Sequence, residues 1–489
     1  MELRSQSRKT TQSMGNDNCG CLVGWPKAKK SKTDQVVSSG NWAQLPSVIL
    51  YDVFSFLSQK DRINASSVCR NWRHVIFHPN FWNEFTFTIQ AGQHEKTKYL
   101  SRTLSSLVKN AVIKFDSLTP VCMTEFTALL QNLSTNTKLK SLMLEPSHCR
   151  LVEPVEYCFD TLNYFSNLSE IIKIFCNFPL EKFSIGGCEE LCQFVPQYLE
   201  RLSNTRPEQV SILGLASVKD DPSNYLICEV DAVLFSAFRN LKILSIDYDA
   251  LCDDVLDTLN GAENLKRLIV HVHGVWFGHP GTSNEAWAKF KQVHPTCEFR
   301  LTLIHAYEEV FHMENGILQI QMPLTHLKVF FCEHINVDVL NLLSSWYPQT
   351  LRSIMWVDSR SPDLEGTWDL VNRFRDAEIN EPDPLVMAAW LCTKLEEVVL
   401  LGYKYYEEDL VAIARLRGNT LKNLEVASED IISNEGCKIP TNLIEEMSKI
   451  FDRPWAPLKS SELHPVICNP TDGDSDEYLQ PKVLADLHL

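Results

Sequence analysis

The side chains that could do chemistry in this chain are its cysteines and histidines, and their spacing decides which chemistry. The 489 residues include 16 cysteines and 14 histidines. A structural zinc site needs cysteines in closely spaced pairs, with a matching second pair of ligands farther along the chain. Cys19 with Cys21 and Cys188 with Cys192 are close pairs without such a second half. We therefore predict no zinc site at either pair.

The best candidate for a metal pair is "HVHG", in which His271 and His273 alternate. Alternate residues of a strand face the same side. However, the pair directly follows an apolar run, where polar residues are ordinary, and no carboxylates accompany it at a defined spacing. Chance pairs of cysteine and histidine are expected in a chain so rich in both, and no family signature marks one as a nucleophile. We predict no metal, no cofactor and no catalytic residue.

Other motifs of catalysis and transport are also missing from the sequence. It contains no phosphate-binding loop, dinucleotide-binding turn, nucleophile elbow or metalloprotease helix. The cysteines lie scattered from Cys19 to Cys468, as buried thiols of a reducing compartment do. No apolar run reaches the roughly 18 residues of a membrane span, and the N-terminus lacks the apolar core of a signal peptide. We expect a binding protein of the cytoplasm or nucleus, with no stable membrane association.

The charge is unevenly distributed. The net charge is −16, yet residues 1–41 hold seven basic and three acidic residues. An acidic body disfavours nucleic acid as the main partner, because affinity for nucleic acid comes mostly from cationic contacts. It suits a basic protein partner and also simply keeps a protein soluble.

The first 40 residues predict a disordered basic tail, because polar residues dominate and apolar periodicity is missing. The basic cluster at 27–32 is compatible with a solvated tail, a nuclear-import signal or a membrane-surface patch. Initiation at Met14 would expose Gly15 beside Cys19 and Cys21, so an alternative, acylated start stays open.

From Leu45 onward the pattern predicts three short helices within about 40 residues. Pro46 suits a first helical turn, and Ser58 can cap the second helix with Asp61 three residues later. The apolar residues exceed what three short helices can hide from each other, since units of this size bury too little surface. Either the rest of the chain or a partner must cover the surplus.

A recurring L-x-x-L-x-[LIV] phrase occupies most of the remaining chain. Successive occurrences start 24 to 44 residues apart, which is the spacing of degenerate leucine-rich repeats with insertions. Each unit cannot bury its own apolar face, so the units must stack. The phrase is read at the following positions: "LKSLML" from Leu139, "LEKFSI" from Leu180, "LKILSI" from Leu241, "LKRLIV" from Leu265, "LTHLKV" from Leu324, "LRSIMW" from Leu351, "LEEVVL" from Leu395 and "LKNLEV" from Leu421. The weaker matches "PEQVSI" from Pro207 and "FRLTLI" from Phe299 fit between them.

The predicted fold class is therefore α/β, with a short three-helix domain at 41–87 and a curved leucine-rich-repeat solenoid over 100–457. An acidic insertion at 358–384 interrupts the solenoid, and we expect 458–489 to be an acidic, flexible C-terminal tail. Charged side chains that alternate with the leucines are weak candidates for binding another protein on the concave strand face. They are Lys242, Lys266, Arg267, Lys328 and Glu397.

The N-terminal helical segment resembles the F-box family. Residues that match the family pattern in order and spacing are Leu45, Pro46, Ile49, Leu50, Val53, Phe54, Leu57, Asp61, Val68, Cys69, Trp72 and Trp82. Val48 departs from the family, which usually has glutamate there. The segment from Pro382 to Val426 also resembles the C-terminal repeats of a member of that family.

The resemblance implies docking of these residues, apart from Asp61, on the Skp adaptor, and through it on the cullin and RING subunits of a ubiquitin ligase. The repeats would present a substrate protein for ubiquitination and proteasomal degradation, by proximity and without catalysis of their own. The alternative is an F-box and repeat scaffold without a degradative role.

Overall fold

The computed structural model describes residues 42–154, 161–220, 227–360, 383–433 and 441–488. The chain divides into two compact units, one ending at Val75 and the other beginning at Ile76. The expected basic tail at 1–40 and most of the insertion at 358–384 lie outside the described residues. No described helix is long and apolar enough to cross a bilayer.

The first unit contains the three predicted helices. They are α1 (Ser47–Ser55), α2 (Gln59–Ser66) and α3 (Arg70–Ile76), preceded by the 3-10 turn η1 (Trp42–Gln44). Ser58 caps α2 as the sequence predicts, because its hydroxyl oxygen accepts the Asp61 amide at 3.2 Å. The Trp72 indole donates to the Trp42 carbonyl at 2.9 Å and so ties α3 to the chain before α1.

The second unit is built on one sheet of twelve parallel strands, in which each strand pairs with the next along the chain. This order is that of a solenoid, because each repeat contacts its neighbours in sequence. The strands are β1 (Glu84–Ile89), β2 (Asn110–Phe115), β3 (Ser141–Pro146), β4 (Lys182–Ser184), β5 (Ile212–Gly214), β6 (Ile243–Asp247), β7 (Arg267–Val272), β8 (Glu298–Ile304), β9 (Leu324–Phe330), β10 (Ser353–Val357), β11 (Glu397–Leu401) and β13 (Asn423–Val426). The predicted α/β solenoid is confirmed.

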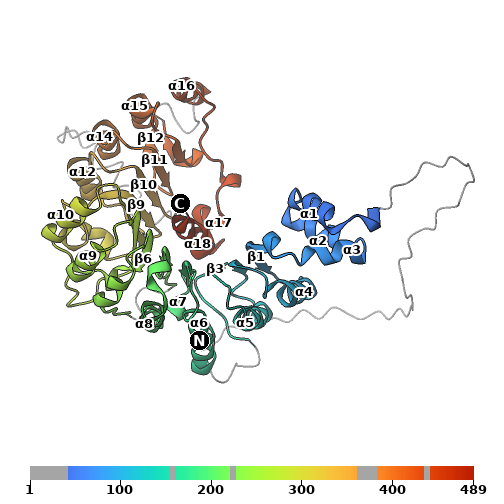
Figure 1. Ribbon diagram of the computed structural model, residues 1–489. Coiled ribbons are helices and arrows are strands. Elements are labelled where there is room, and N and C mark those ends of the chain that lie inside the picture. Colours follow the sequence, from blue (N-terminus) through green and yellow to red (C-terminus); the bar gives the residue numbers. More distant parts are fainter. Residues whose placement is uncertain (1–41, 155–160, 221–226, 361–382, 434–440, 489) are drawn as a thin grey trace, which may run out of the picture. The chain divides into compact units, whose positions relative to one another are not determined.

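Helices and 3-10 turns return the chain between strands and cover one face of the sheet (Figure 1). A second sheet pairs only β12 (Tyr405–Tyr406) with β14 (Ile431–Ile432). The main helices of this layer are α4 (His94–Leu104), α5 (Pro120–Leu133), α6 (Thr161–Phe175), α8 (Val195–Thr205), α9 (Asp253–Leu259), α10 (Asn284–Val293), α12 (Val337–Trp346), α14 (Pro384–Leu391), α15 (Glu407–Arg417) and α16 (Thr441–Phe451).

The other face of the sheet changes character along the solenoid. In β1 buried and exposed side chains alternate, so one face of this strand is open to solvent. In β6, β7 and β10 every residue is buried. Parallel strands that are buried at every position are covered on both faces.

The second cover is the C-terminal segment, in contrast to the flexible tail that the sequence suggests. It forms α17 (Pro465–Cys468), α18 (Ser475–Leu484) and the turn η10 (Ala485–Leu487), which lie against the strands on the face opposite the other helices (Figure 1). Leu479 and Val483 pack in one apolar cluster with Val357 and Val399. Leu487 joins a second cluster on β3, β5, β6 and β7.

Candidate functional site

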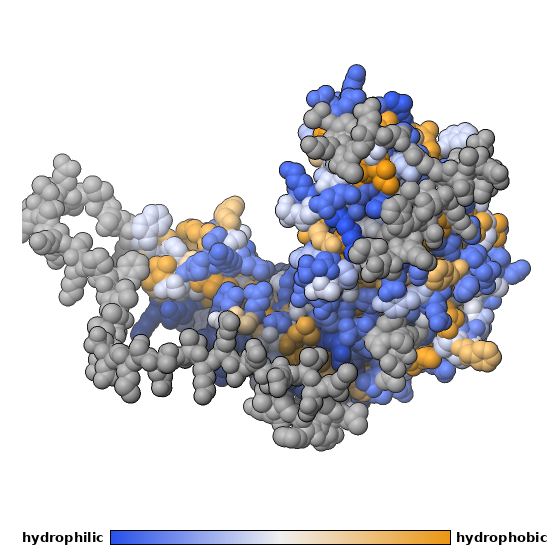
Figure 2. Space-filling model, turned by 180° about the vertical axis from the view of Figure 1, so that it is seen from behind, coloured by the Kyte–Doolittle hydropathy of each residue, from blue (hydrophilic) through white to orange (hydrophobic). Residues whose placement is uncertain are grey.

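The first unit carries an unusually apolar surface for its size. Phe56 is 89% exposed, Trp42 70%, Val48 69% and Val68 67%. Ile49 and Val53, one helical turn apart on α1, are exposed as well. Figure 2 shows hydrophobic side chains exposed on this unit. Several large apolar side chains exposed on one small unit mark an interaction site, because exposing them to water is unfavourable.

The structure divides the predicted adaptor-binding residues into a surface set and a core set. Leu50, Phe54 and Trp82 are buried. Phe54 packs edge-to-face on Trp72, with ring centroids 5.9 Å apart, and so joins α1 to α3. The exposed members, which are able to touch another protein directly, are Pro46, Ile49, Val53 and Val68; Leu45, Leu57, Cys69 and Trp72 are half-buried.

Two exposed aromatic residues were missed by the sequence analysis. Trp42 precedes the helical pattern, and Phe56 follows the last residue of α1, so neither belongs to the apolar stripe of a helix. The sequence already predicts a surplus of apolar side chains in this unit, but only the structure shows which members are exposed.

The weak candidates for substrate contacts do not form one surface. Lys242 and Lys266 are exposed and directly precede the neighbouring strands β6 and β7, where the Lys266 amide donates to the Lys242 carbonyl at 2.9 Å. Glu397 accepts hydrogen bonds from Ser353 at 2.7 Å and Asn423 at 3.2 Å, and so joins three neighbouring strands.

Arg267 and Lys328 are buried beneath the C-terminal segment, which corrects the expectation that they are exposed. Lys328 contacts the Asp486 carboxylate at 2.8 Å, and Arg300 binds the same carboxylate. Arg267 donates to the backbone carbonyls of Asp486 and His488, both at 2.6 Å. These cations hold the C-terminal segment on the sheet, so their side chains are not available to contact another protein.

The two histidines of "HVHG" do meet a carboxylate, Asp247 of β6, in a buried cluster whose ligand atoms lie within 4.8 Å of one another and which hydrogen bonds tie to Ser217. The Ser217 carbonyl lies 2.8 Å from His271 Nδ1 and 3.0 Å from His273 Nε2, where it accepts from both rings. Asp247 accepts from the Ser217 amide at 2.8 Å. Burial lowers the pKa of His273 to about 4, so the ring is neutral. A carbonyl oxygen thus occupies the position toward which both rings point.

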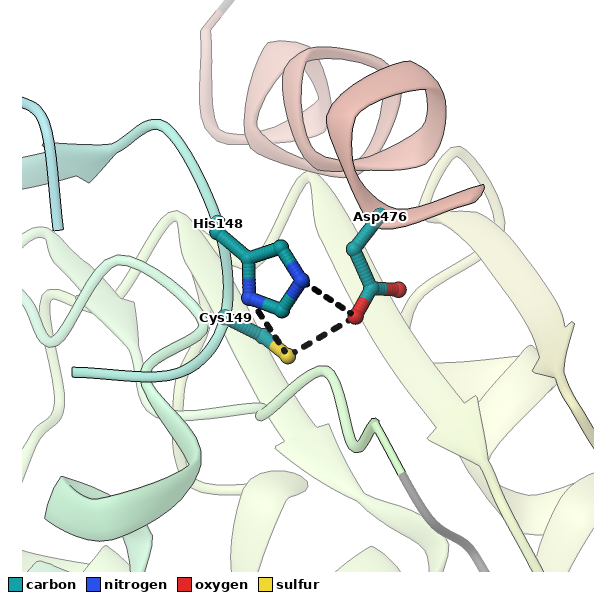
Figure 3. A group of neighbouring side chains, drawn as sticks. All are labelled: His148, Cys149 and Asp476. Carbon is teal, nitrogen blue, oxygen red and sulfur yellow. Dashed lines mark hydrogen bonds and ion pairs between the residues drawn. The ribbon is translucent and has the colours of Figure 1, made fainter. Parts of the chain in front are cut away.

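A second cluster joins the loop after β3 to the start of α18 (Figure 3). His148 Nδ1 accepts the Arg150 amide at 3.0 Å, so the ring proton is on Nε2, which donates to Asp474 at 3.1 Å. The Cys149 thiol donates to Asp476 at 3.0 Å. Burial raises the pKa of Cys149 far above its usual range, and the nearby Asp476 carboxylate raises it further. Without a bound cation the thiol is therefore protonated, which disfavours a role as a nucleophile.

Comparisons with known proteins match these features. Residues 42–88 match the F-box-like family. The sequence is 24% identical to human (Homo sapiens) F-box only protein 33 over 88% of this chain and 85% of that protein. It is 22% identical to mouse (Mus musculus) F-box/LRR-repeat protein 21 over 85% of this chain and 89% of that protein.

Among solved structures, an internalin from Listeria monocytogenes covers 79% of this chain and 89% of its own, with a TM-score of 0.28 and 12% identity. At that level of similarity the comparison adds nothing to the fold described above. The family match, in contrast, covers α1, α2 and α3 and ends within β1. Residues 42–88 are therefore an F-box-like domain, and the chain as a whole is similar to F-box only protein 33 and to F-box/LRR-repeat protein 21.

Proposed function

We propose that this chain is the substrate-receptor subunit of a Skp–cullin–F-box ubiquitin ligase, and that it has no catalytic role of its own. The observation that carries the proposal is the exposed apolar surface of α1, α2 and α3, which lies inside the F-box-like match. Docking on the Skp adaptor would cover that surface and link the chain to the cullin and RING subunits.

The solenoid would hold a substrate protein for ubiquitination and proteasomal degradation. Such a receptor works by proximity, because it raises the local concentration of substrate lysines near the ubiquitin-loaded conjugating enzyme. A receptor of this kind needs a firm attachment at each end and no reactive group. The protonated Cys149 and the neutral His273 suit that role.

The docking surface is tested by placing charges on it. We expect Ile49→Glu combined with Val53→Glu to abolish co-purification with the Skp adaptor, because apolar residues central to an interface each contribute about 2 kcal/mol or more. Both side chains are exposed, so the helices should still form. Phe277→Glu, at an exposed apolar residue of the solenoid, is the matched control and should bind normally.

Undiminished co-purification of the double variant would show that this surface is not the docking site. The degradative role is tested separately, by measuring protein half-lives after depletion of the chain. If no protein that binds the solenoid becomes longer-lived, the chain is a scaffold and not a degradation receptor.

A further inference from the structure

A cavity of about 410 Å³ lies where the loops after β8, β9 and β10 meet the C-terminal segment. Tyr307 contributes from the first loop, Phe331 and Glu333 from the second, and Asp358 from the third, while Asp474 lies across from them at the start of α18. Its volume is in the range of sites that enclose a ligand or a side chain of another protein.

Among the described residues, histidines are the basic side chains beside the carboxylates of this cavity: Asp474 accepts from His148 at 3.1 Å, and His305 belongs to the lining. Asp358 is only 4% exposed, and it accepts the Glu333 amide at 2.6 Å and the Tyr403 hydroxyl at 3.0 Å. Burial raises the pKa of Asp358 to about 6, so the group is ionised at neutral pH. Within the part of the chain that the structure describes, no lysine or arginine lines the cavity. Arg360, close by in sequence, is held by Glu429 at 2.7 Å and Asp430 at 2.8 Å.

The surroundings strengthen this negative potential. Segment 305–316 contains three acidic residues, 331–338 contains two and 470–478 contains four, and none of the three contains lysine or arginine. The exposed carboxylate of Glu333 makes no hydrogen bond or ion pair within the described part of the chain. Charges of one sign that line a concavity raise the local concentration of ligands of the opposite sign.

Aromatic rings complete the lining. Tyr307 is 41% exposed and Phe331 forms part of the cavity wall. His305, Phe331 and Glu333 all have positive φ angles, of 50°, 52° and 63°, although none is glycine. Backbone in this conformation is costly and needs support from its surroundings, here from Asp358, which accepts the Glu333 amide.

We propose that this cavity binds an arginine side chain of the substrate protein. A guanidinium group is planar and permanently charged, so it can stack on an aromatic ring while it donates to two carboxylates, which an ammonium group does less well. This inference rests on the proposed role as a substrate receptor and names the chemistry of the substrate segment. Because α18 covers the concave face of the sheet, the loops at the strand ends remain as accessible surface for a substrate. This arrangement favours the cavity as the binding site.

The experiment uses the full chain in complex with the Skp adaptor to select binders from a phage library of random 12-residue peptides. We expect enrichment of arginine in peptides selected by the wild type. In synthetic versions, replacement of that arginine by citrulline, which is neutral but similar in shape, should weaken binding at least tenfold. Glu333→Gln should weaken it several-fold and Glu333→Lys should abolish it. Glu263→Gln, at an exposed acidic residue of another loop, is the matched control.

Selection of no peptides, or of peptides whose binding is indifferent to citrulline and to Glu333→Lys, would overturn the proposal. If peptides bind only after residues 1–41 are deleted, the occupant is the chain's own basic segment and not a substrate. Adaptor binding is measured in the same preparations. Failure to bind the adaptor, with arginine binding intact, would contradict the ligase role. Intact adaptor binding without a dependence on arginine would contradict only the assignment of the cavity.

Discussion

At the scale of single residues, the most constrained charge is Lys219, whose side chain is fully buried. Its ammonium group lies 3.6 Å from Asp249 and 3.9 Å from Asp247. Burial would raise the pKa of Asp247, but Lys219, His273 and the Ser217 hydroxyl outweigh it, so that this pKa lies well below its usual range. Asp249 has weaker hydrogen-bond support. Burial raises its pKa to about 6, although its carboxylate lies closer to the Lys219 ammonium group than that of Asp247 does.

Lys219→Met should therefore destabilise the solenoid by about 3 kcal/mol at pH 7, because removal of one partner leaves buried carboxylates uncompensated. The pH dependence has a definite sign. A depressed carboxyl pKa contributes stability that is present above the unfolded-state value near 4 and is lost as the pH falls through the folded-state value. The variant loses this contribution, so its deficit should shrink as the pH falls below about 4, where Asp247 of the unfolded chain takes up a proton while Asp247 of the folded wild type stays ionised. Urea unfolding of the variant and the wild type at pH 7 and pH 3.5 measures the deficit in the free energy of unfolding at each pH. Equal deficits at the two pH values would contradict this account.

At the scale of elements, the strands were predictable wherever the leucine phrase occurs, because its leucines must be buried against the helical layer in any stacked arrangement. The strands β1 and β2 were missed, since "EFTFTI" and "NAVIKF" lack that phrase. The closed concave face was also missed. Its signal is the near-continuous apolar character of strands such as "SIMWV", which implies cover on both faces.

The C-terminal helix illustrates the same limit. Read by composition, its sequence is acidic and suggests a solvated tail. Leu479, Val483 and Leu487 nevertheless recur every four residues, and all three are buried. A stripe of three apolar residues is too weak to identify a helix by itself. It becomes interpretable only beside a sheet whose open face is apolar.

Leu479→Ala should consequently lower the free energy of unfolding by about 2–5 kcal/mol, because the side chain is completely buried and its removal leaves a cavity. The matched control is Leu416→Ala on α15, where the side chain is 40% exposed and the expected change is within about 0.5 kcal/mol. Chemical denaturation compares the two. Equal effects would mean that α18 contributes nothing to the stability of the solenoid.

At the scale of the whole molecule, the adaptor-binding residues could be recognised from sequence, but their division into core and surface could not. Periodicity places Leu50 and Val53 in the same apolar pattern, yet Leu50 is buried and Val53 exposed. That distinction depends on how three helices pack, which the pattern of one helix does not contain. The acidic cavity also depends on packing, because its residues come from four segments that are distant in sequence.

The division into two units gives a further expectation. Deletion of residues 475–489 should expose the apolar concave face and increase binding of a hydrophobic dye, while α1, α2 and α3 continue to bind the Skp adaptor. Hydrogen exchange should show loss of protection in β6, β7 and β10 and unchanged protection in the first unit. Loss of protection in both units would show that they fold together.

The position of α18 has a consequence for synthesis of the chain. A solenoid can add one repeat at a time as it leaves the ribosome, but the helix that covers its concave face is translated after every strand of the sheet. Until α18 has been translated, the apolar residues of β6 to β11 face water, and the nascent chain depends on chaperones for solubility. A truncation just before this helix would therefore leave every strand of the solenoid present and its concave face uncovered.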